Sequence, residues 1–258
     1  MHPPEGKLRH VPEPTASFED RLWDRALTQY GTEFDKIENE HWWFAGRRAV
    51  ILAALRHRLP AGSRLLDFGC GAGGLTAELA RFYAVVGFDS AKPAIEVARR
   101  RGLDARLMTD SDPLPRGFDA ACALDVIEHL EDDVAAVRRL GAAVKEGGLV
   151  FLTVPAYPAL WGRMDEVAGH VRRYTMRELE RVVSAAGLRP VHVSYFNTFL
   201  FPAVAIARLM GFPRENHEID QPPRAVNALL RAAFESEAPL ATRFRIPFGV
   251  SILYIAAR

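Results

Sequence analysis

Residues 65–80 read LLDFGCGAGGLTAELA: an apolar strand pattern ends at Asp67, a glycine-dense turn follows, and a helical pattern takes over. Glycines let a ligand approach the backbone and allow the positive φ angles of a tight turn. The turn opens onto a helix N-terminus, whose free N–H groups favour an electron-rich ligand group. The stretch therefore predicts a nucleotide-type ligand site on an α/β sheet, with a ligand-free strand–turn–helix connection as the alternative.

The glycine spacing alone does not choose between ligand classes. Gly69, Gly71 and Gly74 satisfy the dinucleotide pattern G-x-G-x-x-G. With Gly73 in place of Gly74, the same turn satisfies G-x-G-x-G. The next strand pattern, AVVGFD, ends in Asp89. An acid at that strand end accepts ribose hydroxyls both in NAD sites and in other adenosine sites, so both remain open.

Four motifs follow one another along the chain: DFGCGAG from Asp67, the acid Asp89, FDAACALDVIEHL over residues 118–130, and residues 140–155 with the run KEGG. In this order they resemble the motifs of class I S-adenosylmethionine (SAM) methyltransferases. The Glu128-His129-Leu130 run is similar to the quinone-biosynthesis methyltransferases and their small-molecule relatives. The resemblance covers roughly residues 40–196 and implies SAM as the cofactor, with S-adenosylhomocysteine as the product.

Composition bounds the class of protein. With 258 residues and 49% hydrophobic content, the chain has enough material for one large α/β domain. A net charge of +1 provides no field to attract nucleic acid, so we expect no nucleic-acid partner. Cys70 and Cys122 lie far apart in apolar strand contexts, without metal-site spacing, and favour a reducing cytoplasm. We expect no metal site, and residues 1–14 lack the apolar core of a signal peptide.

The apolar segments predict an α/β fold, a Rossmann-like seven-stranded, mostly parallel sheet with helices on both faces. Strands are expected at 64–68, 84–88, 105–109, 120–124, 149–154, 190–197 and 251–257. Helices are expected at 75–82, 93–101, 132–144 and after the capping box at Thr175. By domain, we expect a flexible leader at 1–16, an N-terminal helical cap at 17–60, and the SAM-binding domain at 61–258 with a helical insertion at 198–248 before the last strand.

The N-terminal cap contains an unusual aromatic run. Apolar residues recur at helical spacing over 18–30, and EHWWFAGRR follows at 40–48, ahead of a helix to about residue 59. One interpretation is a core anchor that fastens the cap to the sheet. The other is a lid over the cofactor, in which Trp43 covers the adenosine or sulfonium and Arg47 pairs with the methionine carboxylate. The resemblance to ubiquinone-pathway O-methyltransferases supports the second role for these two residues.

Ligands of such sheets bind at the carboxyl ends of the strands, near the topological switch point. The expected cofactor-binding residues there are Asp67, Gly69, Cys70, Gly71, Asp89, Ser90, Thr109, Asp110 and Leu124. Asp67 is placed to accept the methionine ammonium or to order the loop, and Asp89 to accept the ribose hydroxyls. Asp110 has an adenine contact and a turn-capping role as alternatives. Leu124 packs on the cofactor or offers its carbonyl.

Methyl transfer from a sulfonium is an in-line displacement, so the protein mainly positions the acceptor behind the methyl carbon. His129 is the leading candidate for a general base because histidine titrates near neutral pH, with a structural role at the helix start as its alternative. His170 and Tyr174 are secondary base or orienting candidates. Arg172 and Arg173 are candidates for a substrate phosphate or carboxylate, or for a solvated basic face.

The insertion at 198–248 is rich in apolar residues. Three uses are compatible with it: covering the sheet or a homodimer face, roofing a hydrophobic substrate pocket, and resting on a membrane surface such as the cytoplasmic side of the inner membrane. A prenyl or acyl chain on the substrate would suit the second use. The first apolar segment is too short to span a bilayer.

These observations predict a SAM-dependent methyltransferase that acts on an oxygen or nitrogen nucleophile, with carbon as a further alternative, of a small, apolar or lipid-linked metabolite. An NAD-dependent oxidoreductase and a non-catalytic SAM-binding scaffold are the alternatives. A base-amino methylase is disfavoured because residues 124–127 read LDVI, without the Asn/Asp-Pro-Pro-Tyr run of that class.

Overall fold

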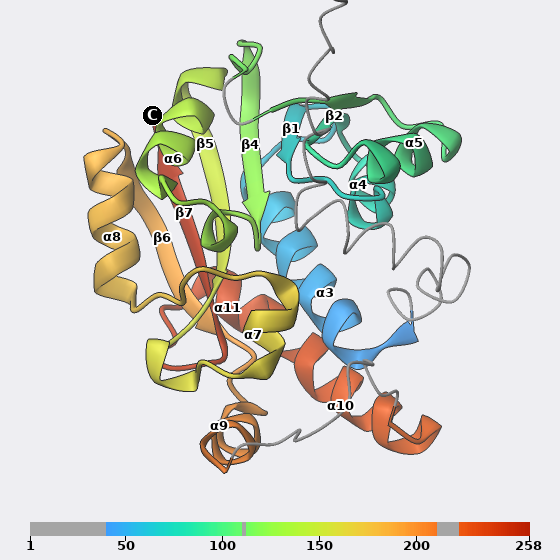
Figure 1. Cartoon of the computed structure of the whole chain (residues 1–258), viewed down its shortest axis with the longest axis vertical. Helices are drawn as coiled ribbons and strands as arrows, with labels where there is room; N and C mark the ends of the chain where they lie inside the picture. Colours follow the sequence, from blue (N-terminus) through green and yellow to red (C-terminus); the bar gives the residue numbers. More distant parts are fainter. Residues whose placement is uncertain (1–39, 110–111, 211–221) are drawn as a thin grey trace, which may run out of the picture.

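The computed structural model describes residues 40–109, 112–210 and 222–258 (Figure 1). Their strands form one seven-stranded sheet in the order β3-β2-β1-β4-β5-β7-β6. The strands are β1 (Arg64–Phe68), β2 (Ala84–Asp89), β3 (Ala105–Leu107), β4 (Phe118–Leu124), β5 (Val144–Pro155), β6 (Arg189–Phe196) and β7 (Ser251–Ala257). Strand β7 runs antiparallel to β5 and β6, and the other neighbouring pairs are parallel. The predicted fold class is confirmed.

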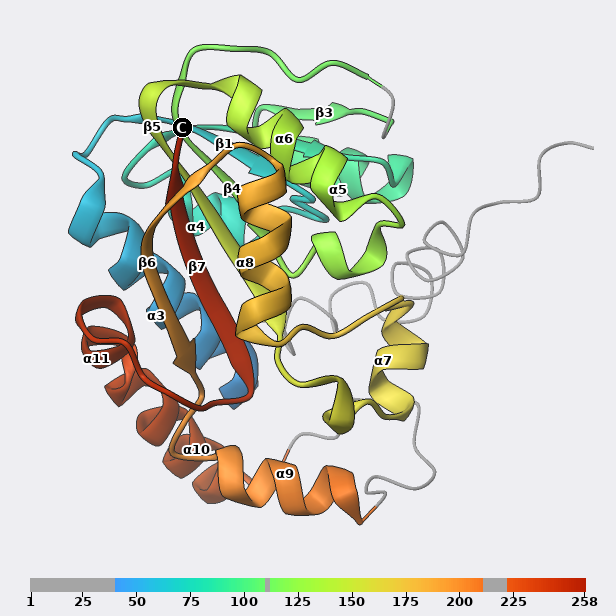
Figure 2. The ribbon, with the colours of Figure 1, turned by 90° about the vertical axis from the view of Figure 1, so that its left-hand side faces the viewer.

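Helices cover both faces of the sheet (Figure 2). They are α3 (Trp42–Arg58), α4 (Gly74–Leu79), α5 (Lys92–Arg100), α6 (Asp133–Ala143), α7 (Arg163–Ala168), α8 (Met176–Ala185), α9 (Phe201–Leu209), α10 (Arg224–Ser236) and α11 (Ala238–Arg243), with the 3-10 turns η2 (Ile127–His129) and η3 (Pro158–Leu160). Side chains of α6 and α8 share one apolar core with the sheet, and those of α3, α10 and α11 share another.

The continuous apolar character of the strands follows from this double cover. Leu65 and Leu66 are neighbours in β1, and both are fully buried. Successive strand residues point to opposite faces, so Leu65 packs in the core below α3 while Leu66 packs in the core below α6. Helices on both faces remove the apolar side chains of the strand from water. The strand therefore does not alternate between apolar and polar residues.

Several predicted boundaries shift for local reasons. Strands β1 and β7 have the expected ends. Strand β3 ends at Leu107 rather than at 109, because the Thr109 N–H and hydroxyl donate to the Asp112 carboxylate. Helix α3 begins at Trp42, inside the aromatic run that was expected to precede it, since His41 accepts a hydrogen bond from the Trp43 N–H as its N-cap.

The expected helical insertion forms α9, α10 and α11. Helix α10 packs directly on α3: a Cβ at Gly46 would lie 2.2 Å from ring atoms of the buried Phe234. The Asn227 side chain accepts from the Trp42 N–H at 2.9 Å and donates to the Glu40 carbonyl at 2.8 Å. Helices α10 and α11 therefore cover α3 and the sheet, the first of the three expected uses.

The expected leader at 1–16, the helix at 18–30 and Asp110 lie outside the described residues. Within residues 40–109, 112–210 and 222–258, no helix has both the length and the apolar character needed to cross a bilayer.

Candidate functional site

The carboxyl ends of β1, β2 and β4 meet at one edge of the sheet. Asp67 of β1 is in register with Gly87 of β2 on one side and with Cys122 of β4 on the other. The chain leaves β1 for β2 in one direction and reaches β4 in the other, so this edge is the topological switch point. In open α/β sheets, ligands bind at such a point.

The glycine turn after β1 has the left-handed backbone that its sequence predicted. Gly69, Gly71 and Gly73 have φ angles of 79°, 54° and 83°. The Gly69 N–H donates to the Phe88 carbonyl at 2.7 Å, which ties the turn to β2. A Cβ at Gly69 would lie 2.4 Å from a Val126 methyl carbon, so only glycine fits. The turn thus leads into α4 with its backbone close to the switch point.

Asp67 is a buried carboxylate at the end of β1. It is 3% exposed and accepts a hydrogen bond from the Thr76 hydroxyl at 2.6 Å. Burial raises its pKa to about 6, because desolvation outweighs the lowering by the Thr76 hydrogen bond and the Arg47 charge. A cationic ligand group beside Asp67 would offset this desolvation.

Asp89, at the end of β2, orders the same turn. Its two carboxylate oxygens accept from the Gly71 N–H at 2.7 Å and the Ala91 N–H at 2.9 Å. Burial raises the pKa of Asp89. A carboxylate oxygen has more than one lone pair, so each retains acceptor capacity for a ligand hydroxyl. Ser90 follows directly and is exposed.

Arg47 joins α3 to the end of β4. Its guanidinium donates to the Leu124 carbonyl at 2.6 Å, forms an ion pair with Asp125, and lies 5.7 Å from the centroid of the Trp43 ring. Asp125 has a φ of 57° and accepts from the Thr153 hydroxyl. Trp43 and Arg47 are therefore brought to the switch-point edge, where Arg47 is held by β4. The sequence motif indicated no role for Asp125.

Two expected contacts have other surroundings. Cys70 is half-buried in the glycine turn rather than in a strand, and it packs near Ile95 and Leu103. Burial raises the pKa of its thiol. Thr109 is exposed and its hydroxyl donates a hydrogen bond to Asp112, which stabilises the loop after β3.

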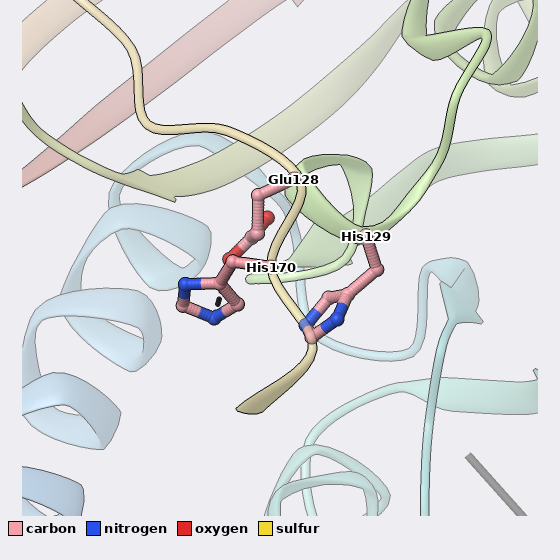
Figure 3. A group of neighbouring side chains, drawn as sticks. All are labelled: Glu128, His129 and His170. Carbon is pink, nitrogen blue, oxygen red and sulfur yellow. Dashed lines mark ion pairs between the residues drawn. The ribbon is translucent and has the colours of Figure 1, made fainter. Parts of the chain in front are cut away.

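A second group of polar side chains lies beyond β4 (Figure 3). Glu128 is fully buried, and neither carboxylate oxygen has a hydrogen-bond partner in another described residue. The His129 and His170 rings meet edge to face with centroids 4.8 Å apart. His170 Nε2 lies 4.0 Å from Glu128 Oε1. Burial, reinforced by His170, lowers the pKa of His129 to about 4, so its imidazole is neutral at physiological pH.

Asp165 fixes the His170 ring of this group. It is 1% exposed and accepts from His170 Nδ1 at 2.8 Å, Arg173 Nε at 2.7 Å and Arg208 Nη1 at 3.1 Å. Burial alone would raise its pKa, but hydrogen bonds from His170 and Arg173 and the positive charge of Arg173 lower it to about 2. Through Arg208, helix α9 is thereby connected to the segment that carries His170.

Tyr174 and the two arginines beside it each contact a buried aspartate. The Tyr174 hydroxyl is buried and donates to Asp133 at 2.8 Å, and burial raises its pKa. Arg172 pairs with the same Asp133 at 2.9 Å. Arg173 donates to Asp165 and to the Ala156 carbonyl. The Tyr174 hydroxyl is thus held inside the core by Asp133, and its role as a base or orienting group stays a prediction.

Sequence reasoning found His129 and His170 separately but missed their meeting with Glu128. His170 lies far along the chain from the other two, and only the fold of the 155–174 segment onto η2 joins them: the Val171 N–H donates to the Glu128 carbonyl at 2.8 Å. A histidine following the glycine that ends α7 was the available signal.

Known proteins share both the sequence pattern and the fold. A family model described as "Methyltransferase domain" matches residues 41–193, more than half of the chain. The chain is 38% identical over 149 residues to a ubiquinone biosynthesis O-methyltransferase from Methylocella silvestris, covering 49% of this chain and 58% of that protein. The enzyme of that name from Xanthomonas campestris is 33% identical, covering 47% of this chain and 60% of that protein. The chain thus spans about 60% of the length of these curated relatives.

Solved structures support the fold. A phosphoethanolamine N-methyltransferase of Haemonchus contortus, solved with SAM, has a TM-score of 0.59 at 18% identity and covers 96% of this chain and 61% of its own. The cyclase SpnF has a TM-score of 0.60 at 22% identity, covering 96% of this chain and 98% of its own. At these identities the likeness shows the fold alone, and the reaction has to be inferred from the site.

Proposed function

The chain belongs to the class I SAM-dependent methyltransferase family, and from that premise we propose that it transfers the sulfonium methyl group of SAM to a hydroxyl oxygen, or else an amine nitrogen, of a small apolar metabolite. The observation that carries this proposal is the pair of carboxylates at the ends of β1 and β2, the buried Asp67 and the half-buried Asp89, beside the glycine turn. Adenosine sites in such sheets use an acid at the second strand for the ribose.

The side chains at the switch point fit this cofactor. Asp89 would hold the ribose hydroxyls, and Asp67 would accept the methionine ammonium, whose charge offsets the desolvation of that carboxylate. Gly69 and Gly71 leave the backbone accessible, and Trp43 with Arg47 would border the methionine end. When bound, SAM supplies an electrophilic methyl carbon. The chain's own residues have to orient the acceptor for in-line attack.

His129 is our candidate for contact with the acceptor. Its neutral imidazole can accept a hydrogen bond from an acceptor hydroxyl, while a pKa of about 4 makes it a weak base. We therefore assign it orientation of the acceptor and acceptance of its hydrogen bond. His170, held by Asp165, is its neighbour in the same role.

An apolar acceptor is supported by the position of α9. Arg208 pairs with Asp165, which connects this helix to the His170 segment, and Figure 2 shows α9 and α7 at the same end of the molecule. Ile206 and Leu209 are 58% and 71% exposed. Such side chains would suit a prenyl or acyl chain on the acceptor. The names of the curated relatives favour a hydroxyl acceptor.

The test has a binding step and a transfer step. Calorimetry with SAM, S-adenosylhomocysteine and NADH should show binding of the first two only. Methyl-labelled SAM is then incubated with phenols and amines of increasing apolar chain length, and labelled product is measured by mass spectrometry. NADH binding in place of SAM would indicate the oxidoreductase, and SAM binding without transfer to any acceptor would indicate the scaffold.

His129→Ala refines the test. Turnover should fall by about 10- to 100-fold, the loss expected when a buried hydrogen-bonding group is left without its partner, while SAM affinity stays within about twofold. An unchanged turnover number would remove His129 from contact with the acceptor.

A further inference from the structure

We propose that Glu128, His129 and His170 bind a divalent transition-metal ion. Figure 3 shows the three side chains gathered from two segments, η2 and the turn after α7. One ligand atom from each residue can be chosen so that all three atoms lie within 4.8 Å of one another. The three residues supply two imidazole nitrogens and one carboxylate oxygen.

The first support is the state of Glu128. Its side chain is fully buried, and both carboxylate oxygens lack a hydrogen-bond partner in another described residue. A carboxylate in this state is costly to bury. The nearby guanidinium groups are engaged elsewhere: Arg47 with Leu124 and Asp125, and Arg173 with Asp165. A cation seated against Glu128 supplies the missing partner.

The second support is the orientation of the two imidazoles. His170 Nδ1 lies 2.8 Å from Asp165 Oδ1, and His129 Nδ1 lies 3.3 Å from the Gly169 carbonyl oxygen. Both partners are acceptors, so each Nδ1 carries the hydrogen, and in the neutral ring each Nε2 has the lone pair that a metal ion would bind. Metal-binding histidines almost always donate their second N–H to a carboxylate or carbonyl in this way. Asp165 is itself fixed by Arg173 and Arg208.

The spacing suits one ion. Metal–nitrogen and metal–oxygen bonds of roughly 2.1 Å keep two ligands of one ion within about 4.2 Å of each other. The 4.0 Å between His170 Nε2 and Glu128 Oε1 satisfies this limit. The full 4.8 Å spread requires a few tenths of an ångström of side-chain adjustment. Two nitrogens and one oxygen favour Zn²⁺, Mn²⁺ or Fe²⁺ over Mg²⁺ or Ca²⁺, which prefer oxygen ligands.

Three protein ligands leave coordination positions open, and this gives the ion a role that rests on the proposed function. A hydroxyl acceptor bound there would lose its proton to water more readily, because a divalent ion stabilises the oxyanion. The oxyanion then forms the new O–C bond while the S–C bond of the sulfonium breaks, giving an uncharged ether and S-adenosylhomocysteine. With the ion bound, Nε2 of His129 is a metal ligand, so the ion replaces the direct hydrogen bond from the acceptor to this imidazole and activates the acceptor itself.

The experiment uses the full chain, stripped with EDTA and dialysed. Zn²⁺ binding is measured by calorimetry and Co²⁺ binding by its visible absorption, with one ion per chain expected. Glu128→Gln and His170→Ala should each weaken Zn²⁺ binding by at least 100-fold, whereas Glu131→Gln should leave it unchanged. Glu131 is a matched control because its side chain is 91% exposed, close by in sequence. Equal Zn²⁺ affinity in the wild type and Glu128→Gln, or no bound ion in the wild type, would overturn the inference.

A measurement on the wild type alone covers the case in which a variant does not fold. Long-range ¹H–¹⁵N spectra of the imidazoles should show Zn²⁺ shifting Nε2, not Nδ1, of two histidines, and unmoved histidine signals would contradict the site. Metal binding and methyl transfer are measured independently, so the two proposals can fail separately. Transfer that persists unchanged in EDTA removes the ion's catalytic role, whereas metal binding without any SAM-dependent transfer removes the proposed function and leaves the metal site intact.

Discussion

The two ends of the candidate site differ in how complete they are. At the ends of β1 and β2, Asp67 and Asp89 accept hydrogen bonds from Thr76, Gly71 and Ala91. Beyond β4, the fully buried Glu128 has no such partner in another described residue. The first region is ordered by its own chain, whereas the second brings one carboxylate and two imidazoles together. In our proposal, one sheet therefore combines a cofactor region ordered by its own chain with a region at η2 that a cation completes.

The difference has a physical origin in sequence distance. At the proposed cofactor site, the carboxylates of Asp67 and Asp89 and the groups that donate hydrogen bonds to them come from β1, the glycine turn, α4 and the end of β2. Local backbone geometry therefore satisfies these hydrogen bonds. In the second region, η2 lies against the segment after α7. Asp165 holds His170 of that segment and is itself paired with Arg208 of α9. Four changes test this contrast, from the largest expected effect to the smallest.

Asp89→Ala should have the largest effect. It removes a carboxylate that holds the Gly71 N–H and, in the proposed complex, the ribose hydroxyls. Two charge-assisted hydrogen bonds predict SAM binding about 100-fold weaker by calorimetry. Zn²⁺ binding should stay unchanged if the two regions are independent. Asp104→Ala, at an exposed carboxylate paired with Arg106, is the control, and equal losses in both variants would reject the ribose assignment.

Glu128→Met should stabilise the metal-free protein. The substitution replaces a buried carboxylate lacking partners with an apolar side chain of similar length. We expect the free energy of unfolding in EDTA to rise by about 1–3 kcal/mol, measured by urea denaturation. Saturating Zn²⁺ should stabilise the wild type and leave the variant unaffected. A destabilised variant in EDTA would mean that the Glu128 carboxylate makes stabilising interactions in the metal-free protein. The two regions would then not differ in this respect.

SAM affinity should depend on pH through Asp67. Its folded-state pKa of about 6 lies above the ordinary value of 3.8, so ionisation destabilises the ligand-free protein as pH rises from about 4 through 6. The SAM ammonium reverses that penalty and requires the ionised form. Affinity should therefore fall as pH drops below about 6, approaching tenfold per pH unit. Calorimetry between pH 7.5 and 5 checks this, and Asp67→Asn should give weak binding with a flat profile.

Thr76→Val should have the smallest effect. The near-isosteric change removes the 2.6 Å hydrogen bond to Asp67 and leaves the packing in place. One hydrogen bond to a charged group predicts SAM binding about 5- to 10-fold weaker and a higher apparent pKa in the pH profile. An unaltered pH profile would show that Thr76 does not tune Asp67.

The proposed cofactor site was predictable because its acids lie in the last positions of their own strands. Asp67 and Asp89 end strands whose apolar patterns are clear, and positive φ angles at Gly69, Gly71 and Gly73 are what their spacing requires. The outcomes for Tyr174 and Cys70 could not be predicted in the same way. Their burial depends on Asp133 of α6 and on Ile95 of α5, which the sequence pattern does not connect to them.

The sequence by itself determined which segments form strands, where the glycine turn lies and which acids stand at the switch point. Periodicity and glycine conformation act over a few neighbouring residues, so local patterns are sufficient for these features. Only the tertiary structure decided that α10 lies against α3 at Gly46 and that His170 meets Glu128. Those contacts depend on how distant segments bury their apolar faces together, and no local pattern encodes which distant side chains that packing brings into reach.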